Sequence, residues 1–223
     1  MSLFRKPNRK SNYSTESTIP GVSIYSSQLD TLQLPFFIAT LDVGVKNMCI
    51  RVELLYTCSE DIVNFSDISR ENVFRELVWF DNILIGNSNT NAMGCIKGVD
   101  ENILQPLMNY LSCRQQIGGV AIFVEGQMMN NPKASRIEQH ILSSFPHICP
   151  PSVVGTINAK KKYSYFSIEN SKTRKKEAVE VALSILSQIN DSESISIIQS
   201  ADKKDDLADT VLMMQMVILQ IFN

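Results

Sequence analysis

The stretch Asp205-Asp206-Leu207-Ala208-Asp209 places three carboxylates within five residues near the end of the chain. On a helix, Asp209 shares a face with Asp205 at i, i+4 and with Asp206 at i, i+3, so either pair can present two carboxylates to one site. Like charges at this spacing repel unless a positive charge lies between them, and a bound metal ion would supply that charge. Acidic residues also complement the helix dipole in a first turn, so the motif alone leaves a purely structural reading open.

Two apolar segments of the chain each end at an acidic residue. Residues 36–41 form an apolar run of strand length that leads directly into Asp42 and Gly44, and residues 119–124 form a second run that ends at Glu125. The carboxyl ends of parallel strands meet at one edge of a sheet, where open α/β sheets place their sites. We therefore expect Asp42 and Glu125 to lie side by side, although Asp42 and Gly44 alone would also fit an ordinary hairpin turn.

The remaining pattern predicts the elements that position these acids. The length favours one well-buried domain over residues 34–223, and residues 1–33 are basic and poor in apolar side chains, as in a disordered arm. Apolar periodicity predicts further strands over 48–55, 77–80 and 150–156, and helices over 99–114, 133–144 and 177–189.

Three local sequence features indicate where the predicted helices begin or are interrupted. Pro106 is expected to break or shift the first of them, while Asn131 and Pro132 offer a cap and a first-turn proline to the second. Asp202 can cap a final helix, in which Asp205 and Asp209 point away from an apolar stripe. That stripe consists of Leu207, Val211, Met214, Ile218 and Ile221.

Composition narrows the possible chemistry. Hydrophobic residues make up 44% of the 223 residues and the formal net charge is −2, so any basic surface must be local. With only two histidines and no C-x-x-C pair among five cysteines, a hard cation held by carboxylates is the favoured type of metal site. The most apolar run, 211–222, is too short to span a bilayer, and no signal peptide is visible, so we expect an intracellular protein without membrane contact.

A basic segment with interleaved aromatic residues lies between 160 and 176. Glu169 is its single acid, and Tyr163, Tyr165 and Phe166 alternate with the basic side chains, a mixture suited to phosphate contact and stacking on exposed bases. A solvated loop or a nuclear-import signal would have the same composition. The seven basic residues are Lys160, Lys161, Lys162, Lys172, Arg174, Lys175 and Lys176.

Four segments taken in order, 41–47, 124–127, 174–176 and 203–209, resemble the RuvC-like Holliday junction resolvases, most closely the poxvirus type and next the fungal mitochondrial enzymes. The resemblance implies an RNase H-like fold, with a mixed central sheet flanked by helices in a single domain. It also implies a homodimeric, Mg²⁺-dependent endonuclease that resolves four-way DNA junctions by paired symmetric nicks. Mn²⁺ is expected to substitute for Mg²⁺, with two ions per active site and no small-molecule cofactor.

By position, the resemblance makes Asp42, Glu125 and Asp209 metal ligands. The bacterial spacing D-x-x-D selects Asp206 as the fourth ligand and the fungal spacing D-x-x-x-D selects Asp205, with Asp206 favoured. Lys176, or else Lys175, corresponds to the basic residue near the scissile phosphate. The expected DNA contacts are Lys46, Lys133, Arg136, Lys160, Lys161, Lys162, Lys172, Arg174, Lys175 and Lys176.

Two other functions fit the same residues. One is an RNase H-like nuclease that acts on RNA–DNA hybrids or structured RNA, and the other is a junction-binding protein without catalysis. Actin-like ATPases also begin with a strand and a D-x-G turn, but they require two copies of the core, for which 223 residues leave no room. A resolvase of this type is expected to serve DNA recombination, repair or viral DNA processing, at a viral replication site or in a virion, or in a mitochondrion or nucleus.

Overall fold

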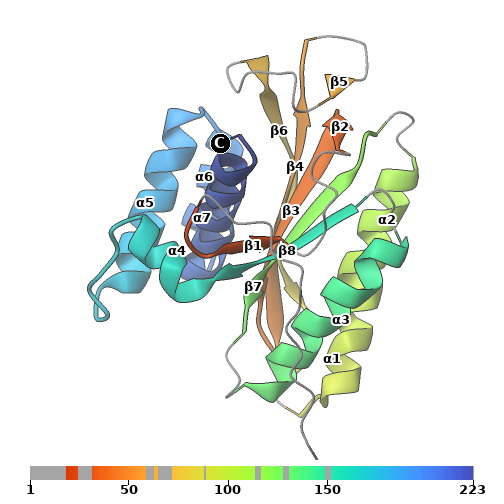
Figure 1. Ribbon diagram of the computed structural model, residues 1–223. Coiled ribbons are helices and arrows are strands. Elements are labelled where there is room, and N and C mark those ends of the chain that lie inside the picture. Colours follow the sequence, from red (N-terminus) through yellow and green to blue (C-terminus); the bar gives the residue numbers. More distant parts are fainter. Residues whose placement is uncertain are drawn as a thin grey trace, which may run out of the picture.

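The computed structural model describes residues 19–24, 32–58, 63–64, 72–87, 89–113, 117–127, 131–148 and 152–222. A six-stranded sheet with the order β1-β8-β7-β3-β4-β6 lies at the centre, with helices α1 to α3 on one face and α4 to α7 on the other (Figure 1). This three-layer arrangement confirms the predicted α/β fold class, in which a mixed central sheet is flanked by helices.

The parallel part of the sheet consists of β3 (Phe36–Val43), β7 (Val120–Gly126) and β8 (Ser152–Asn158). Side chains of β3 are buried on both faces, as expected for a central strand covered by two helical layers. Antiparallel strands complete the sheet: β4 (Asn47–Tyr56) pairs with β3, β6 (Phe74–Leu84) pairs with β4, and β1 (Val22–Ile24) pairs with β8. A separate pair is formed by β2 (Gln33–Leu34) and β5 (Val63–Asn64).

Strand β1 lies within the segment 1–33 that the sequence predicts to be a disordered arm. Val22 and Ile24 are buried against the core, and the strand extends the sheet beyond β8. Its short length explains why periodicity gives no signal there, because three residues carry too little alternation to detect. Residues 1–18 and 25–31 of the predicted arm lie outside the described residues.

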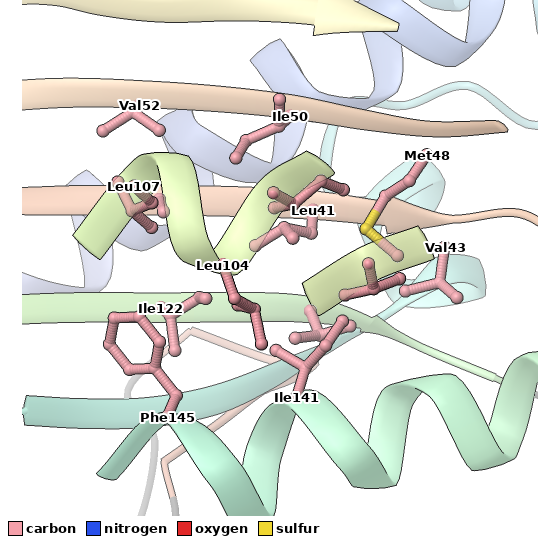
Figure 2. Packing of buried hydrophobic residues seen from close by; sticks show 14 of the residues in the cluster. Leu41, Val43, Met48, Ile50, Val52, Leu104, Leu107, Ile122, Ile141 and Phe145 are labelled. Atoms are coloured by element: carbon pink, nitrogen blue, oxygen red, sulfur yellow. The ribbon is translucent and has the colours of Figure 1, made fainter. Parts of the chain in front are cut away.

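The first helical layer contains α1 (Ala92–Val99), α2 (Gln105–Ser112) and α3 (Pro132–Ile148). A π-helical turn, Asp100–Leu104, joins α1 to α2 directly before Pro106, whose ring would clash with a carbonyl inside a regular α-helix. Asn131 caps α3 as predicted, its Oδ1 accepting the Ala134 N–H at 3.3 Å. Figure 2 shows the core beneath this layer, where Leu104, Leu107, Ile141 and Phe145 pack against Leu41, Ile50, Val52 and Ile122 of the sheet.

The second layer contains α4 (Ala159–Tyr165), α5 (Arg174–Gln188), α6 (Ser192–Ser200) and α7 (Lys204–Ile221). Helix α7 packs directly on β3 and β4 and is covered by α5 (Figure 1). It is consequently buried at every position from Leu207 to Met214, not along one stripe as the sequence suggests. No helix in the described part of the chain is long and apolar enough to cross a membrane.

Candidate active site

Asp42 and Glu125 come together at the carboxyl ends of neighbouring parallel strands. Leu41 pairs with Val124 in the β3–β7 register, so the two acids that follow these residues lie abreast, and both are half-buried. Burial raises the pKa of Asp42 well above its usual range, and the Glu125 carboxyl raises it further through its charge and a shared hydrogen bond. This is the arrangement that the two apolar runs predict.

Asp209 contributes to the same site from α7. The residue is 9% exposed, and the helix is fastened to the sheet nearby by a 3.1 Å hydrogen bond from Thr40 Oγ1 to the Thr210 carbonyl. Burial raises the pKa of Asp209, and the neighbouring Glu125 charge adds to this, against the opposing effects of Lys162 and Tyr163. Three elements far apart in sequence thus direct carboxylates to one place.

Lys162 supplies positive charge at the centre of these acids. It is fully buried on α4, and its Nζ lies 2.7 Å from Glu125 Oε1 and 3.2 Å from Asp209 Oδ1. Burial alone would lower the pKa of Lys162, but the carboxylates of Glu125, Asp209 and Asp42 outweigh it and raise the pKa, so the ammonium stays charged. The sequence predicts Lys162 as a surface contact for DNA, whereas the structure commits its ammonium to the acids.

Tyr163, the next residue of α4, also contacts Asp209. Its hydroxyl donates a 2.7 Å hydrogen bond to Asp209 Oδ2, and its ring lies 5.1 Å beneath the Arg174 guanidinium. Sequence reasoning treats this tyrosine only as an aromatic residue suited to stacking on bases. Nothing local marks it otherwise, because its contact depends on how α4 and α7 dock.

The donor set suits a hard divalent cation. It consists of carboxylate oxygens, which Mg²⁺ and Mn²⁺ prefer, and Asp209 Oδ1 is buried without a hydrogen bond. Among the described residues, no three acidic, His or Cys side chains form a ready set of ligands around one point. The ammonium of Lys162 lies between Glu125 and Asp209 instead.

Asp205 and Asp206 lie on the rim of the site. Asp205 forms an ion pair with Lys175 of α5, and Asp206 Oδ2 lies 3.7 Å from Lys203 Nζ. Burial raises the pKa of Cys49, and the charges of Asp42, its cross-strand neighbour, and of Asp206 raise it further. Both acids are therefore near the site, and the choice of Asp206 as the fourth ligand stays a prediction.

The predicted DNA contacts divide into three groups. Lys160 and Lys161 are exposed and line a hollow of about 690 Å³ together with Gly126 and Glu138, and none of the candidate-site acids lines it. At the start of α5, Lys172, Lys175 and Lys176 are exposed, whereas Arg174 is half-buried on Tyr163. Lys46, Lys133 and Arg136 lie on other elements, and of these Lys133 donates to the Thr90 carbonyl at 2.7 Å.

No protein-family model matches the sequence, and no curated protein matches it. Among solved structures, the chain is similar to Thermus thermophilus RuvC, with a TM-score of 0.49, 11% identity and coverage of 81% of this chain and 94% of that one. A structure of T. thermophilus RuvC in complex with Holliday junction substrate gives a TM-score of 0.49, 12% identity and coverage of 81% and 92%. An exopolyphosphatase from Cytophaga hutchinsonii gives 0.29, 9%, 57% and 36%. Sequence identity is low in all three comparisons.

Proposed function

We propose that this protein is a metal-dependent endonuclease that resolves four-way DNA junctions. The observation that carries the proposal is the convergence of Asp42, Glu125 and Asp209, from β3, β7 and α7, on one half-buried place, with exposed lysines on α4 and at the start of α5. Carboxylates in excess of nearby positive charge are suited to divalent ions, and the lysines are suited to a phosphate backbone. Such a nuclease would serve DNA recombination, repair or viral DNA processing.

Asp42, Glu125 and Asp209, with Asp206 or Asp205, would hold the ions. Bound Mg²⁺ or Mn²⁺ would activate water and stabilise the leaving oxygen of phosphodiester cleavage. The chain's own contribution is positional and electrostatic. Lys162 offsets the charge of the carboxylates from within, while Lys176, or Lys175 beside Asp205, offsets the charge that develops on the phosphate.

Substrate selection would rest on branched shape. The exposed lysines of α4 and α5 contact phosphates, and such contacts position a duplex without reading its sequence. Two symmetry-related cuts need two sites, which a closed two-fold homodimer supplies in the symmetry of the junction. Paired nicks therefore follow from the assembly, and each protomer contributes one cut.

The proposal is tested by incubating the protein with a synthetic four-way junction, a linear duplex and an RNA–DNA hybrid, each with Mg²⁺ or with EDTA. We expect rapid cutting of the junction alone, in Mg²⁺ alone. Asp42→Asn and Glu125→Gln should each reduce the cutting rate by at least about a hundredfold, in the range found for removing a catalytic group, while junction binding persists. Glu169→Gln, at an exposed position, makes the same chemical change away from the site and should cut normally. Preference for the hybrid, or cutting in EDTA, would contradict the proposal.

One observation favours a second candidate, a junction-binding protein without catalysis. Lys162 compensates Glu125 and Asp209 without any metal ion, as an ion pair that merely stabilises the fold would. In that case the wild-type protein would bind junctions and cut none, and Asp42→Asn would alter neither property. The same assay separates the two candidates.

A further inference from the structure

The two oxygens of the Asp209 carboxylate are held by two consecutive residues of α4. Tyr163 donates its hydroxyl hydrogen to Oδ2 at 2.7 Å, and Lys162 brings its ammonium to 3.2 Å from Oδ1. The two contacts differ in strength, because the hydroxyl bond to Oδ2 is short whereas Oδ1 has the longer ion-pair contact with Lys162. Oδ2 is thus the more firmly held of the two oxygens.

The tyrosine hydroxyl is held in this position by its surroundings. Asn158 caps α4, accepting the Lys161 N–H at 3.1 Å, and the Tyr163 carbonyl accepts the Ile168 N–H at 2.9 Å where the helix ends. Two cations lie near the ring, the Lys162 ammonium 4.9 Å and the Arg174 guanidinium 5.1 Å from its centroid.

Resting on the function proposed above, we infer that Tyr163 is a positioning residue that keeps Oδ1 of Asp209 as the oxygen presented to a divalent cation. A free carboxylate can bind a cation through either oxygen or through both. The hydroxyl bond to Oδ2 holds the carboxylate with Oδ1 toward the Lys162 ammonium, which also contacts Glu125. Tyr163 thereby fixes which oxygen of Asp209 faces the other acids of the site.

Tyr163→Phe tests this inference because it removes the hydroxyl and keeps the ring beneath Arg174. Partners that orient a metal ligand typically contribute about 10- to 100-fold in metal affinity. We expect Mn²⁺ to bind DNA-free Tyr163→Phe about 10-fold more weakly than wild type, by calorimetry or electron paramagnetic resonance. In junction cutting, half-maximal rate should need correspondingly more metal, while kcat at saturating metal changes little.

Tyr165→Phe is the matched control. Tyr165 is exposed on the same helix, and its ring contacts Phe166 rather than the carboxylates, so its variant should bind Mn²⁺ as wild type does. Thermal unfolding in EDTA shows whether both variants are folded. Wild-type Mn²⁺ affinity in Tyr163→Phe would overturn the inference, and so would an equal loss in Tyr165→Phe.

Failure of the proposed function has a different signature. A wild-type protein that binds Mn²⁺ but cuts no junction refutes the nuclease, while the Mn²⁺ affinities of the two tyrosine variants still decide the role of Tyr163. A wild-type protein that binds no divalent ion refutes both, since no cation then reaches Oδ1.

Discussion

A fully buried lysine needs compensation at close range, and Lys162 finds it in Glu125 and Asp209. Glu125 and Asp209 in turn have Lys162 as their ion-pair partner among the described residues. Asp42 is a third acid at the site, so one lysine faces three carboxyl groups. Under the proposed function, a divalent cation held by these carboxylates would add to the stability that Lys162 provides.

Lys162→Met should destabilise the metal-free protein strongly, because it removes the buried partner of two carboxylates and preserves most of the side-chain volume. Breaking a buried ion pair typically costs about 3–5 kcal/mol of unfolding free energy. Urea unfolding in EDTA measures this loss, and addition of Mg²⁺ should recover part of it, because an ion that binds only the folded state stabilises that state.

Lys161→Met is the control for this change. Lys161 is exposed on the neighbouring position of α4, where a substitution should alter the unfolding free energy by no more than about 0.5 kcal/mol. Equal losses in the two variants, or a Lys162→Met loss that Mg²⁺ leaves unchanged, would contradict the role of Lys162 as the counter-charge of a cation site.

The acids of the site could be predicted from sequence, but their partners on α4 could not. Asp42 and Glu125 follow recognisable apolar runs, and Asp209 lies three or four residues after another aspartate, which is the spacing of one helix face. Lys162 lies in a run of three lysines whose other members are exposed. Its burial is decided by the docking of α4 against β7 and α7, which local pattern does not encode.

At the scale of elements, a second polar cluster joins the sheet to the α5–α6 turn. Arg51 of β4 is 1% exposed and lies 2.6 Å from Glu53 Oε1 and 2.7 Å from Asp191 Oδ2, and it also donates to Ser194 Oγ at 2.7 Å. Arg75 of β6 completes the cluster at 2.7 Å from Glu53 Oε2. Because Asp191 also caps α6, this cluster fixes the helix that packs beside α7.

Asp191→Asn isolates the charge in this cluster, because Asn is as good an N-cap as Asp. Burial alone would raise the pKa of Asp191, but hydrogen bonds from Ser194 and Arg51 outweigh it and hold the pKa below its usual range. A lowered folded-state pKa contributes stability that is complete above the unfolded pKa, about 3.9, and is lost as the pH falls through the folded value. We expect the unfolding free energy of wild type to exceed that of the variant by about 1–2 kcal/mol from pH 7 to 5. This difference should shrink below pH 4.

Urea unfolding at pH 7, 5, 4 and 3 measures this difference in unfolding free energy. Glu193 lies in the same first turn of α6 but is exposed. Glu193→Gln should therefore differ less from wild type in unfolding free energy, and that difference should depend little on pH. A wild-type advantage that grows as the pH falls would contradict the assigned charge interaction.

The predictable elements are those with long or strongly apolar patterns. Strands β3, β4 and β7 and helices α3 and α5 appear close to their predicted ranges. Helices α4 and α6 were not predicted, because the first is short and basic and the second is rich in serine, so neither has a clear apolar face. Strand β6 extends beyond the predicted range 77–80 at both ends. The flanking residues alternate between exposed and half-buried positions, so they lack the continuous apolar run on which the prediction depends.

At the scale of the whole molecule, a net charge of −2 leaves room for local basic surface. The three acids of the candidate site are at least half-buried, whereas Lys160, Lys161, Lys172 and Lys176 on α4 and before or at the start of α5 are exposed. Phosphates would therefore be drawn to the rim of the site and not to the surface in general. Under the proposed function, one such rim would place one strand of a junction over one set of carboxylates, so paired cuts would require a second protomer.

Mixed dimers test this requirement. If wild-type and Asp42→Asn protomers with different affinity tags are co-expressed and the heterodimer is isolated, it should contain one competent site. On a supercoiled plasmid with an extruded cruciform, wild type should give linear product by two nicks within one complex, and the heterodimer should give nicked circles. The initial nicking rate should be about half that of wild type, because one of two equivalent sites remains. Gel electrophoresis of the plasmid forms separates these products. Linear product formed by the heterodimer as readily as by wild type would mean that one protomer makes both cuts, and the two-fold arrangement would then have to be abandoned.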